Sequence, residues 1–186
     1  MTIADVTADT KRRMDAAVEK VSEDFGRIRT GRANPQLLEK VTVDYYGAPT
    51  PLNQMANFSV PEGRILVVNP FDKGMVNDVE KAIRDADLGL NPSNDGQIIR
   101  CVFPELTQER RKEYIKMAKT AAEDGKIAIR NVRRSARDAI SKLEDDGEVG
   151  ADEAERANKK LEEVTSTHVA RIDTLLEQKE QDLLDV

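Results

Sequence analysis

Apolar residues recur with helical spacing over three long stretches of the chain. In residues 1–30 they are separated alternately by four and three positions, at Met14, Val18, Val21, Phe25 and Ile28. Residues 105–145 and 151–184 show the same alternation. This spacing places the apolar side chains on one face of a helix. We therefore predict three long helices that must pack together, since none can bury its apolar face alone.

The second and third predicted helices have apolar faces of different character. The face of the second is built largely of small residues, which would let a neighbouring helix approach closely, and Thr107 is its candidate N-cap. It comprises Ile115, Ala118, Ala122, Gly125, Ile129, Val132, Ala136, Ala139 and Leu143. The face of the third comprises Ala154, Ala157, Leu161, Val164, His168, Ile172 and Leu175.

Between residues 31 and 104 the apolar pattern changes. Residues 41–46, 64–68 and 97–103 are β-branched and aromatic runs bounded by Gly, Pro and Asn, which is typical of strands. Residues 75–86 return to helical spacing. All seven prolines also fall in this middle part, whereas the stretches on either side have none. We predict a small β/α/β domain here.

Together these patterns predict an α+β fold, a long antiparallel three-helix bundle with an inserted domain. The bundle would be discontinuous, formed by residues 1–30 and 105–186, with residues 31–104 inserted. Two short connections would then join the domains, near 30–32 and 104–106. We expect them to act as a hinge, at Thr30, Gly31, Pro104 and Glu105.

Composition narrows the class of protein. The one cysteine, Cys101, excludes an intramolecular disulfide and a thiolate metal cluster, which fits a reducing cytosol. The sequence has neither a signal-like apolar run at its start nor an apolar stretch of membrane-spanning length. We expect a soluble cytoplasmic protein with no membrane partner.

The charge distribution is more informative than the net charge of −6. Residues 105–143 carry eleven basic and six acidic side chains, whereas residues 144–186 carry five and fourteen. The second predicted helix is therefore basic and the third strongly acidic. A nucleic-acid partner, which the net charge alone disfavours, remains open for the basic helix.

The sequence offers little for catalysis. No glycine-rich phosphate loop is present, and the one histidine, His168, lies on an apolar face where we expect it to pack. A divalent metal site from Asp145, Asp146 and Asp152 is conceivable, but carboxylates spread around a helix favour a solvated or protein-binding face. We predict a protein without enzymatic activity, cofactor or bound metal.

Five basic residues of the second predicted helix share one strip of its surface. Lys126, Arg130, Arg133, Arg134 and Arg137, hereafter the arginine stripe, are separated by four, three, one and three positions. Guanidinium groups match phosphate oxygens bidentately. Because no aromatic residues are interleaved, recognition of a folded RNA backbone is favoured over base stacking. The alternative is a solvated charged face, or ion pairs with the acidic third helix.

A second basic group, Arg27, Arg29 and Arg32, lies at the end of the first helix. Arg29 and Arg32 flank the predicted hinge residue Gly31. This group could extend an RNA-binding surface, although scattered solvated charge near a helix end explains it equally well.

Several motifs, taken in order, resemble those of the ribosome recycling factor family. They span residues 28–134, and the flanking segments agree with the family in length and helical character. The motifs are Ile28-Arg29-Thr30-Gly31-Arg32-Ala33-Asn34-Pro35, Tyr45-Tyr46-Gly47-Ala48-Pro49-Thr50-Pro51-Leu52, Asn69-Pro70-Phe71-Asp72, Asp87-Leu88-Gly89-Leu90-Asn91-Pro92, Leu106-Thr107-Gln108-Glu109-Arg110-Arg111-Lys112 and Arg130-Asn131-Val132-Arg133-Arg134.

The resemblance implies a monomeric factor with roughly the outline of a transfer RNA that acts after termination. Together with elongation factor G and GTP, such factors disassemble the 70S ribosome and release messenger and deacylated transfer RNA. The bundle would bind large-subunit ribosomal RNA, and the inserted domain would receive the push from the GTPase. By motif, Arg29, Arg130 and Arg133 match the family's RNA-contacting arginines, with Arg32 and Arg134 as neighbours.

One departure and two alternatives remain. Where the family often has an acid after the paired arginines, this chain has Ser135-Ala136-Arg137, which makes tighter backbone binding plausible. A non-catalytic coiled-coil adaptor that binds proteins would show no salt-dependent RNA binding. A hydrolase using the C-terminal carboxylates would need a metal and would turn over without a partner.

Overall fold

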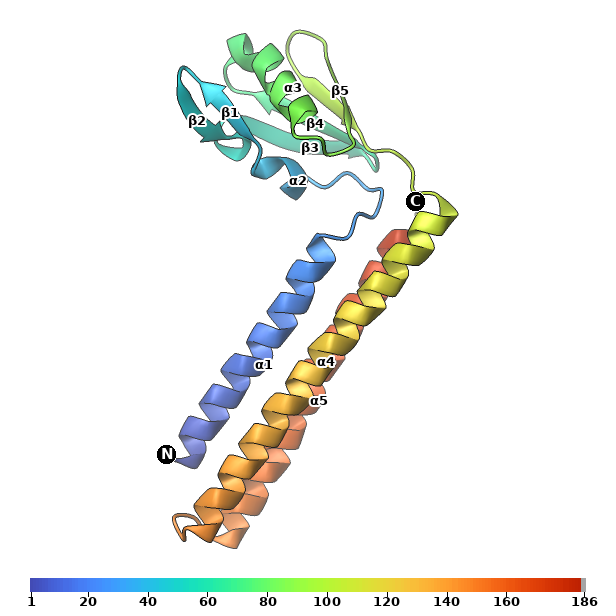
Figure 1. Ribbon diagram of the computed structural model, residues 1–186. Helices are drawn as coiled ribbons and strands as arrows, with labels where there is room; N and C mark the ends of the chain where they lie inside the picture. Colours follow the sequence, from blue (N-terminus) through green and yellow to red (C-terminus); the bar gives the residue numbers. More distant parts are fainter. Residues whose placement is uncertain (185–186) are drawn as a thin grey trace. The chain divides into compact units, whose positions relative to one another are not determined.

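The computed structural model describes residues 1–184, which form two compact units (Figure 1). The helical unit comprises Met1–Arg29 and the chain from Gln108 onward, and the sheet unit comprises Thr30–Thr107. Long helices in one unit and a sheet in the other confirm the predicted α+β fold class. Residues 185 and 186 of the predicted bundle segment 105–186 lie outside the described residues.

Helix α1 spans Ile3–Gly26 and begins at a capping box. The Thr2 hydroxyl accepts the Asp5 backbone N–H, and the Asp5 carboxylate accepts the Thr2 N–H at 2.8 Å. These bonds satisfy two backbone donors that the first turn leaves without partners. The helix ends at Gly26, four residues before the predicted end at residue 30.

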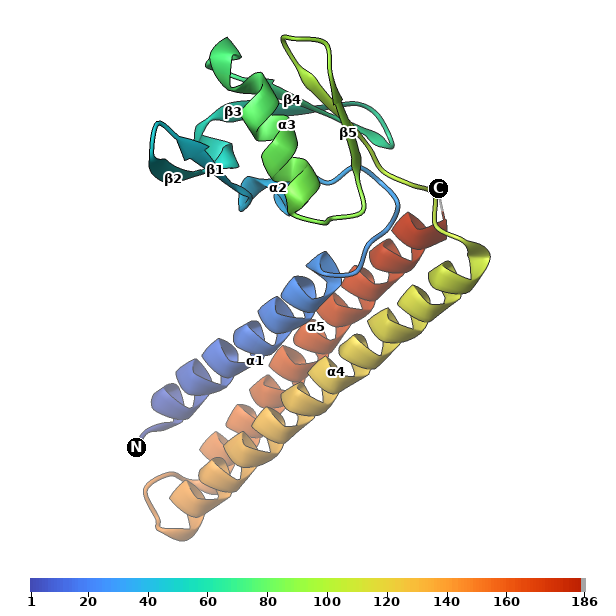
Figure 2. The same ribbon diagram turned by 45° about the horizontal axis from the view of Figure 1, so that its top comes forward.

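Helices α4 (Gln108–Asp145) and α5 (Ala151–Leu184) are joined by a short turn. Helix α4 begins three residues later than predicted, directly after Thr107. At its end, Glu148 N–H bonds Leu143 O and Gly147 N–H bonds Glu144 O, each at 2.9 Å. This is a Schellman motif, which requires the left-handed backbone that Gly147 adopts at φ +70°. The chain thereby reverses, so α4 runs antiparallel to both α1 and α5 (Figure 2).

The apolar faces of α1, α4 and α5 meet in one core. All five face residues predicted for the first helix are buried, although Ile28 lies just beyond the end of α1. On α4, Ile140 is buried where Ala139 was expected, and on α5 Thr165 is buried where Val164 was expected. In both cases the buried residue is the one directly after the predicted residue. Because a helix has 3.6 residues per turn, a spacing of either three or four positions keeps a residue near the same face.

The sheet unit contains two sheets. Strands β1 (Thr42–Tyr45) and β2 (Ala48–Pro51) form an antiparallel hairpin. Strands β3 (Ala56–Glu62), β4 (Ile65–Pro70), β6 (Ile99–Val102) and β5 (Asn91–Asn94) form an antiparallel sheet in the order β3-β4-β6-β5. Sequence periodicity predicted strands corresponding to β1, β4 and β6 and missed the other three.

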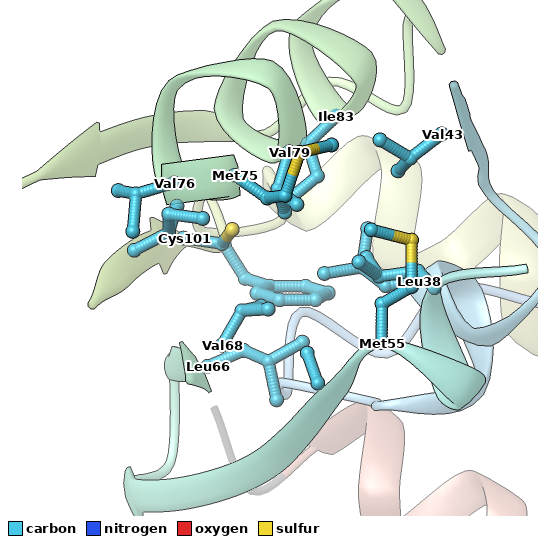
Figure 3. Close-up of a cluster of buried hydrophobic side chains, with 14 residues drawn as sticks. Leu38, Val43, Met55, Leu66, Val68, Met75, Val76, Val79, Ile83 and Cys101 are labelled. Atoms are coloured by element: carbon cyan, nitrogen blue, oxygen red, sulfur yellow. The ribbon is translucent and has the colours of Figure 1, made fainter. Parts of the chain in front are cut away.

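Helix α3 (Val76–Asp85) covers one face of the larger sheet, and a short helix, α2 (Gln36–Glu39), adds Leu38 to the same core. Two 3₁₀ turns, Leu52–Gln54 and Lys73–Met75, complete the unit. Figure 3 shows the side chains of α3 facing those of β4 and β6. The packed side chains labelled there are Leu38, Val43, Met55, Leu66, Val68, Met75, Val76, Val79, Ile83 and Cys101.

Candidate nucleic-acid interface

The arginine stripe runs along α4 beside its buried face. Ile129, Val132 and Ala136 are buried, whereas Arg130, Arg134 and Arg137 are exposed. At 100° per residue, the stripe occupies the side of α4 that turns toward α5 and solvent. The five residues differ in how firmly acidic neighbours hold them.

Two residues of the stripe form ion pairs with α5. Lys126 pairs with Asp173, and its side chain is only 18% exposed. The Arg133 Nη1 atom lies 3.5 Å from Glu162 Oε2, with the arginine side chain 40% exposed. For these two residues the structure shows the alternative interpretation, ion pairs with the acidic third helix. Local spacing did not reveal these acids because they belong to another helix.

Arg130 donates a hydrogen bond to Glu123 of its own helix, with 3.0 Å between Nη1 and Oε1. Both side chains are about half exposed, at 50% and 53%. Ion pairs this exposed contribute about 0–1 kcal/mol, since water competes for both groups. Arg130 and Arg133 can therefore exchange their carboxylate for another anion at little cost.

Arg134 and Arg137 are exposed, and neither has an ion-pair partner among residues 1–184. Asp138, four residues after Arg134, does not pair with it. The Ser135 hydroxyl donates to the Asn131 carbonyl oxygen at 3.1 Å. The guanidinium groups of Arg134 and Arg137 are therefore exposed and without an ion pair among the described residues, whereas those of Arg130 and Arg133 form weak, exposed ion pairs.

This arrangement suits an extended polyanion. Guanidinium groups spaced along one helix face can each take a phosphate oxygen pair. The exposed aromatic residues among those described all lie in the sheet unit, so the stripe offers no platform for base stacking.

The second basic group is split between the units. Arg27 and Arg29 are exposed residues of the helical unit, and Arg29 has no ion-pair partner among the described residues. Arg32 belongs to the sheet unit, and its N–H contacts the Thr30 hydroxyl at 3.4 Å. Val21 packs beside Gly125 and α1 runs opposite to α4, so Arg29 lies about 13 Å along the bundle from Lys126 and about 20 Å or more from the four arginines of the stripe. Within the helical unit, Arg29 is therefore separate from the stripe.

His168 is 4% exposed, as expected for a residue on an apolar face, but its ring is also part of a polar link that the sequence did not reveal. Its Nε2 atom lies 2.8 Å from Asp15 Oδ1 of α1, and its Nδ1 atom lies 2.7 Å from the Val164 carbonyl oxygen. Arg171 donates a further bond to Asp15 at 2.8 Å. Bonds from His168 and Arg171 lower the pKa of Asp15 to about 2. The link ties α1 to α5.

Among residues 1–184, no three His, Cys, Asp or Glu side chains are grouped so as to hold a metal ion, and the conceivable set of Asp145, Asp146 and Asp152 is not brought together. Cys101 is buried in the sheet unit, where burial raises the pKa of its thiol to about 11. None of the described helices is long and apolar enough to cross a membrane.

Comparison with known proteins gives one consistent answer. The family model described as ribosome recycling factor matches residues 5–184. Ribosome-recycling factors of Cutibacterium acnes and Streptomyces avermitilis are 56% and 58% identical over 184 residues, covering 99% of this chain and all of theirs. A solution structure of the ribosome recycling factor has a TM-score of 0.79 at 35% identity, covering 99% of this chain and 98% of its own. The T. thermophilus factor has a TM-score of 0.69 at 43% identity, covering 99% and 100%.

Proposed function

The chain belongs to the ribosome recycling factor family, and from this premise we propose that it binds the post-termination ribosome and disassembles it into subunits. Elongation factor G and GTP act with it, and messenger and deacylated transfer RNA are released. One relative supports the proposal directly. The T. thermophilus factor is described together with Escherichia coli elongation factor G, bound to the E. coli post-termination complex.

The observation that supports ribosome binding by this chain is that two residues of the arginine stripe, Arg134 and Arg137, are exposed and have no ion-pair partner among the described residues. Arg134 and Arg137 need no acidic partner to be displaced, and Arg130 and Arg133 lose only weak, exposed ion pairs. These four residues bind the phosphate backbone of large-subunit ribosomal RNA. Lys126, mostly buried and paired with Asp173, chiefly holds α4 to α5. Arg29 and Arg32 add contacts elsewhere along the same RNA.

The chain works as a monomeric cytoplasmic factor without catalytic residues. In this account the energy for disassembly comes from GTP hydrolysis by elongation factor G, and the recycling factor couples that energy to the ribosome. Two carboxylates of α5, those of Asp173 and Glu162, form ion pairs with the arginine stripe.

Coupling of that kind needs movement between the parts of the chain, and we place the hinge at Thr30, Gly31, Pro104 and Glu105. The two compact units divide between Arg29 and Thr30 and between Thr107 and Gln108, close to these residues. Gly31 has φ +76°, a left-handed conformation that glycine adopts without a steric penalty. Helix α1 already ends at Gly26, so an irregular segment precedes the crossing.

Subunit splitting, followed by light scattering, tests the proposal. Post-termination ribosomes are mixed with elongation factor G, GTP and either the wild-type chain or the Arg133→Ala or Arg134→Gln/Arg137→Gln variants. We expect wild type to split the ribosomes and both variants to need higher concentrations for the same rate. Splitting without elongation factor G or GTP would contradict the proposed partner dependence. A wild-type chain that binds no ribosomes, or binds them independently of salt, would favour a protein-binding adaptor.

A further inference from the structure

Two arginines of the arginine stripe are held against the protein surface by glutamates. Arg130 reaches Glu123, seven residues earlier on α4, with 3.0 Å between Nη1 and Oε1. Ion pairs within a helix usually join residues three or four positions apart, so this pair spans two turns, about 10 Å along the axis. Arg133 reaches across to Glu162 of α5, with 3.5 Å between Nη1 and Oε2. Both guanidinium groups therefore lie beside carboxylates in the free protein.

These two ion pairs contribute little to the packing of the bundle. The pair on α4 joins no two helices, and every side chain of both pairs is at least 40% exposed. Pairs this exposed are weak because water competes for both charges. Lys126 and Asp173 make a firmer connection between α4 and α5, since the lysine side chain is only 18% exposed. The packing of α4 against α5 therefore has little need of Glu123 or Glu162.

Both glutamates occupy groups that the proposed function assigns to phosphate. A carboxylate and a phosphate each present two oxygens to the fork of a guanidinium, so the two anions compete for the same donors. RNA that takes Arg130 or Arg133 must displace the glutamate, whose negative charge then lies beside the phosphates and repels them. When the contact with RNA opens, the carboxylate is still within reach of its arginine and captures it again.

We propose that Glu123 and Glu162 are intramolecular competitors of RNA phosphate, and that they set how long the chain stays on the ribosome. This inference rests on the proposed function, because it takes the arginine stripe as the RNA-binding surface. Arg134 and Arg137, which have no ion-pair partner among the described residues, keep the RNA bound. Arg130 and Arg133 pass between phosphate and carboxylate. Faster release lets one chain act on several ribosomes in succession.

Affinity and dissociation rate for purified post-termination ribosomes test the competition. Glu123→Gln and Glu162→Gln keep the side-chain shape and remove the charge. Each should tighten binding about two- to fivefold, the strength of an exposed ion pair, mainly through slower dissociation. The matched control is Asp138→Asn, which removes the same charge from an exposed residue of α4 that forms no ion pair among the described residues. It should tighten binding clearly less.

A double-mutant cycle separates competition from a general change in charge. In an Arg130→Gln chain, Glu123 has no guanidinium group to hold. Adding Glu123→Gln to that chain should therefore tighten binding no more than adding Asp138→Asn does. Urea unfolding accompanies the cycle, and we expect every variant to unfold close to the wild-type midpoint because the substituted residues are exposed.

Ribosome splitting with elongation factor G and GTP gives the functional readout. With the factor in excess over ribosomes, the Glu123→Gln/Glu162→Gln chain should split them at least as fast as wild type. With ribosomes in excess over the factor, it should split them about threefold more slowly or less, because each chain stays bound longer before it reaches the next ribosome. A merely structural role of the two glutamates would not make the result depend on which component is in excess.

Affinities of the two glutamate variants that equal wild type, or that rise no more than in Asp138→Asn, would overturn the inference. A wild-type splitting rate for the double variant with ribosomes in excess would overturn it as well. If wild-type binding to ribosomes weakens with salt in those cases, the proposed function stands and only the competition is rejected. If wild type binds no ribosomes, or binds them independently of salt, both are rejected.

Discussion

Gly125 on α4 lies directly against Val21 on α1. A Cβ atom added to Gly125 would overlap the Val21 side chain and would lie 3.0 Å from Ile172 Cδ1 of α5. Glycine in the middle of a helix costs about 1 kcal/mol relative to alanine. It is nevertheless required here, because it lets all three helices meet at one level. The close approach fixes the register of α1 against α4.

We predict that Gly125→Ala destabilises the helical unit by about 1–3 kcal/mol, since the added methyl group overpacks the core. Urea unfolding followed by circular dichroism measures the loss. The matched control is Gly26→Ala at the end of α1, where a Cβ meets nothing within 4 Å and no loss is expected. Adding Val21→Ala to Gly125→Ala should give a smaller loss than the two single losses combined. Equal stability of Gly125→Ala and wild type would contradict the close packing.

The link between Asp15 and His168 predicts a specific pH dependence. Hydrogen bonds lower the pKa of Asp15 from 3.8 to about 2, so its contribution to stability is fully present above about pH 4 and is lost as the pH falls toward 2. The Asp15 side chain is 39% exposed, which reduces that contribution to about 1 kcal/mol. Asp15→Asn should therefore be less stable than wild type at pH 6, with the difference shrinking at pH 3. A difference independent of pH would argue against an ionised Asp15 in the link.

Cys101 allows the sheet unit to be followed separately. Burial raises the pKa of its thiol from 9.0 to about 11, which lowers the thiolate fraction at pH 8 about 100-fold. We expect a thiol reagent to label the native chain at least that much more slowly than the urea-unfolded chain. Rapid labelling of the native chain would show that β6, which lies between β4 and β5, opens readily.

The hinge proposal predicts that binding and splitting can be separated. Gly31→Ala strains a backbone held at φ +76° by about 1–2 kcal/mol and alters the crossing between the units. We expect ribosome binding within twofold of wild type and slower splitting in the assay with elongation factor G. Gly63→Ala, in the same unit and with open space around it, serves as the control. Equal splitting rates for the two variants would remove Gly31 from the hinge.

The parts of the fold that sequence predicted best depend on local periodicity. The apolar faces of α1, α4 and α5 follow from residue spacing alone, with errors of one position at Ala139 and Val164. Strands β2 and β5 were missed because Ala48–Pro51 and Asn91–Asn94 are short and rich in proline or polar residues, and only pairing with β1 and β6 makes them strands.

In the candidate site, too, features that depend on local spacing were predicted, and contacts between helices were not. The shared face of the arginine stripe follows from spacing along one helix. The ion pairs from Lys126 to Asp173 and from Arg133 to Glu162 depend on how α5 lies against α4, which spacing does not fix. The turn at Tyr46 and Gly47 was missed as well, because Tyr46 was assigned to the strand 41–46 and the strand that follows Gly47 was not recognised.

Salt-dependent ribosome binding by two matched variants tests the role of the arginine stripe most directly. Arg137→Gln and Lys142→Gln each remove one exposed positive charge from α4, and neither residue has an ion-pair partner among those described. Their side chains project about 140° apart around the helix. Affinity for ribosomes is measured across a range of potassium chloride concentrations. Arg137→Gln should bind more weakly at low salt and lower the slope of log affinity against log salt by about 0.7–0.9, with Lys142→Gln like wild type. Identical slopes for all three chains would contradict RNA binding by this face of α4.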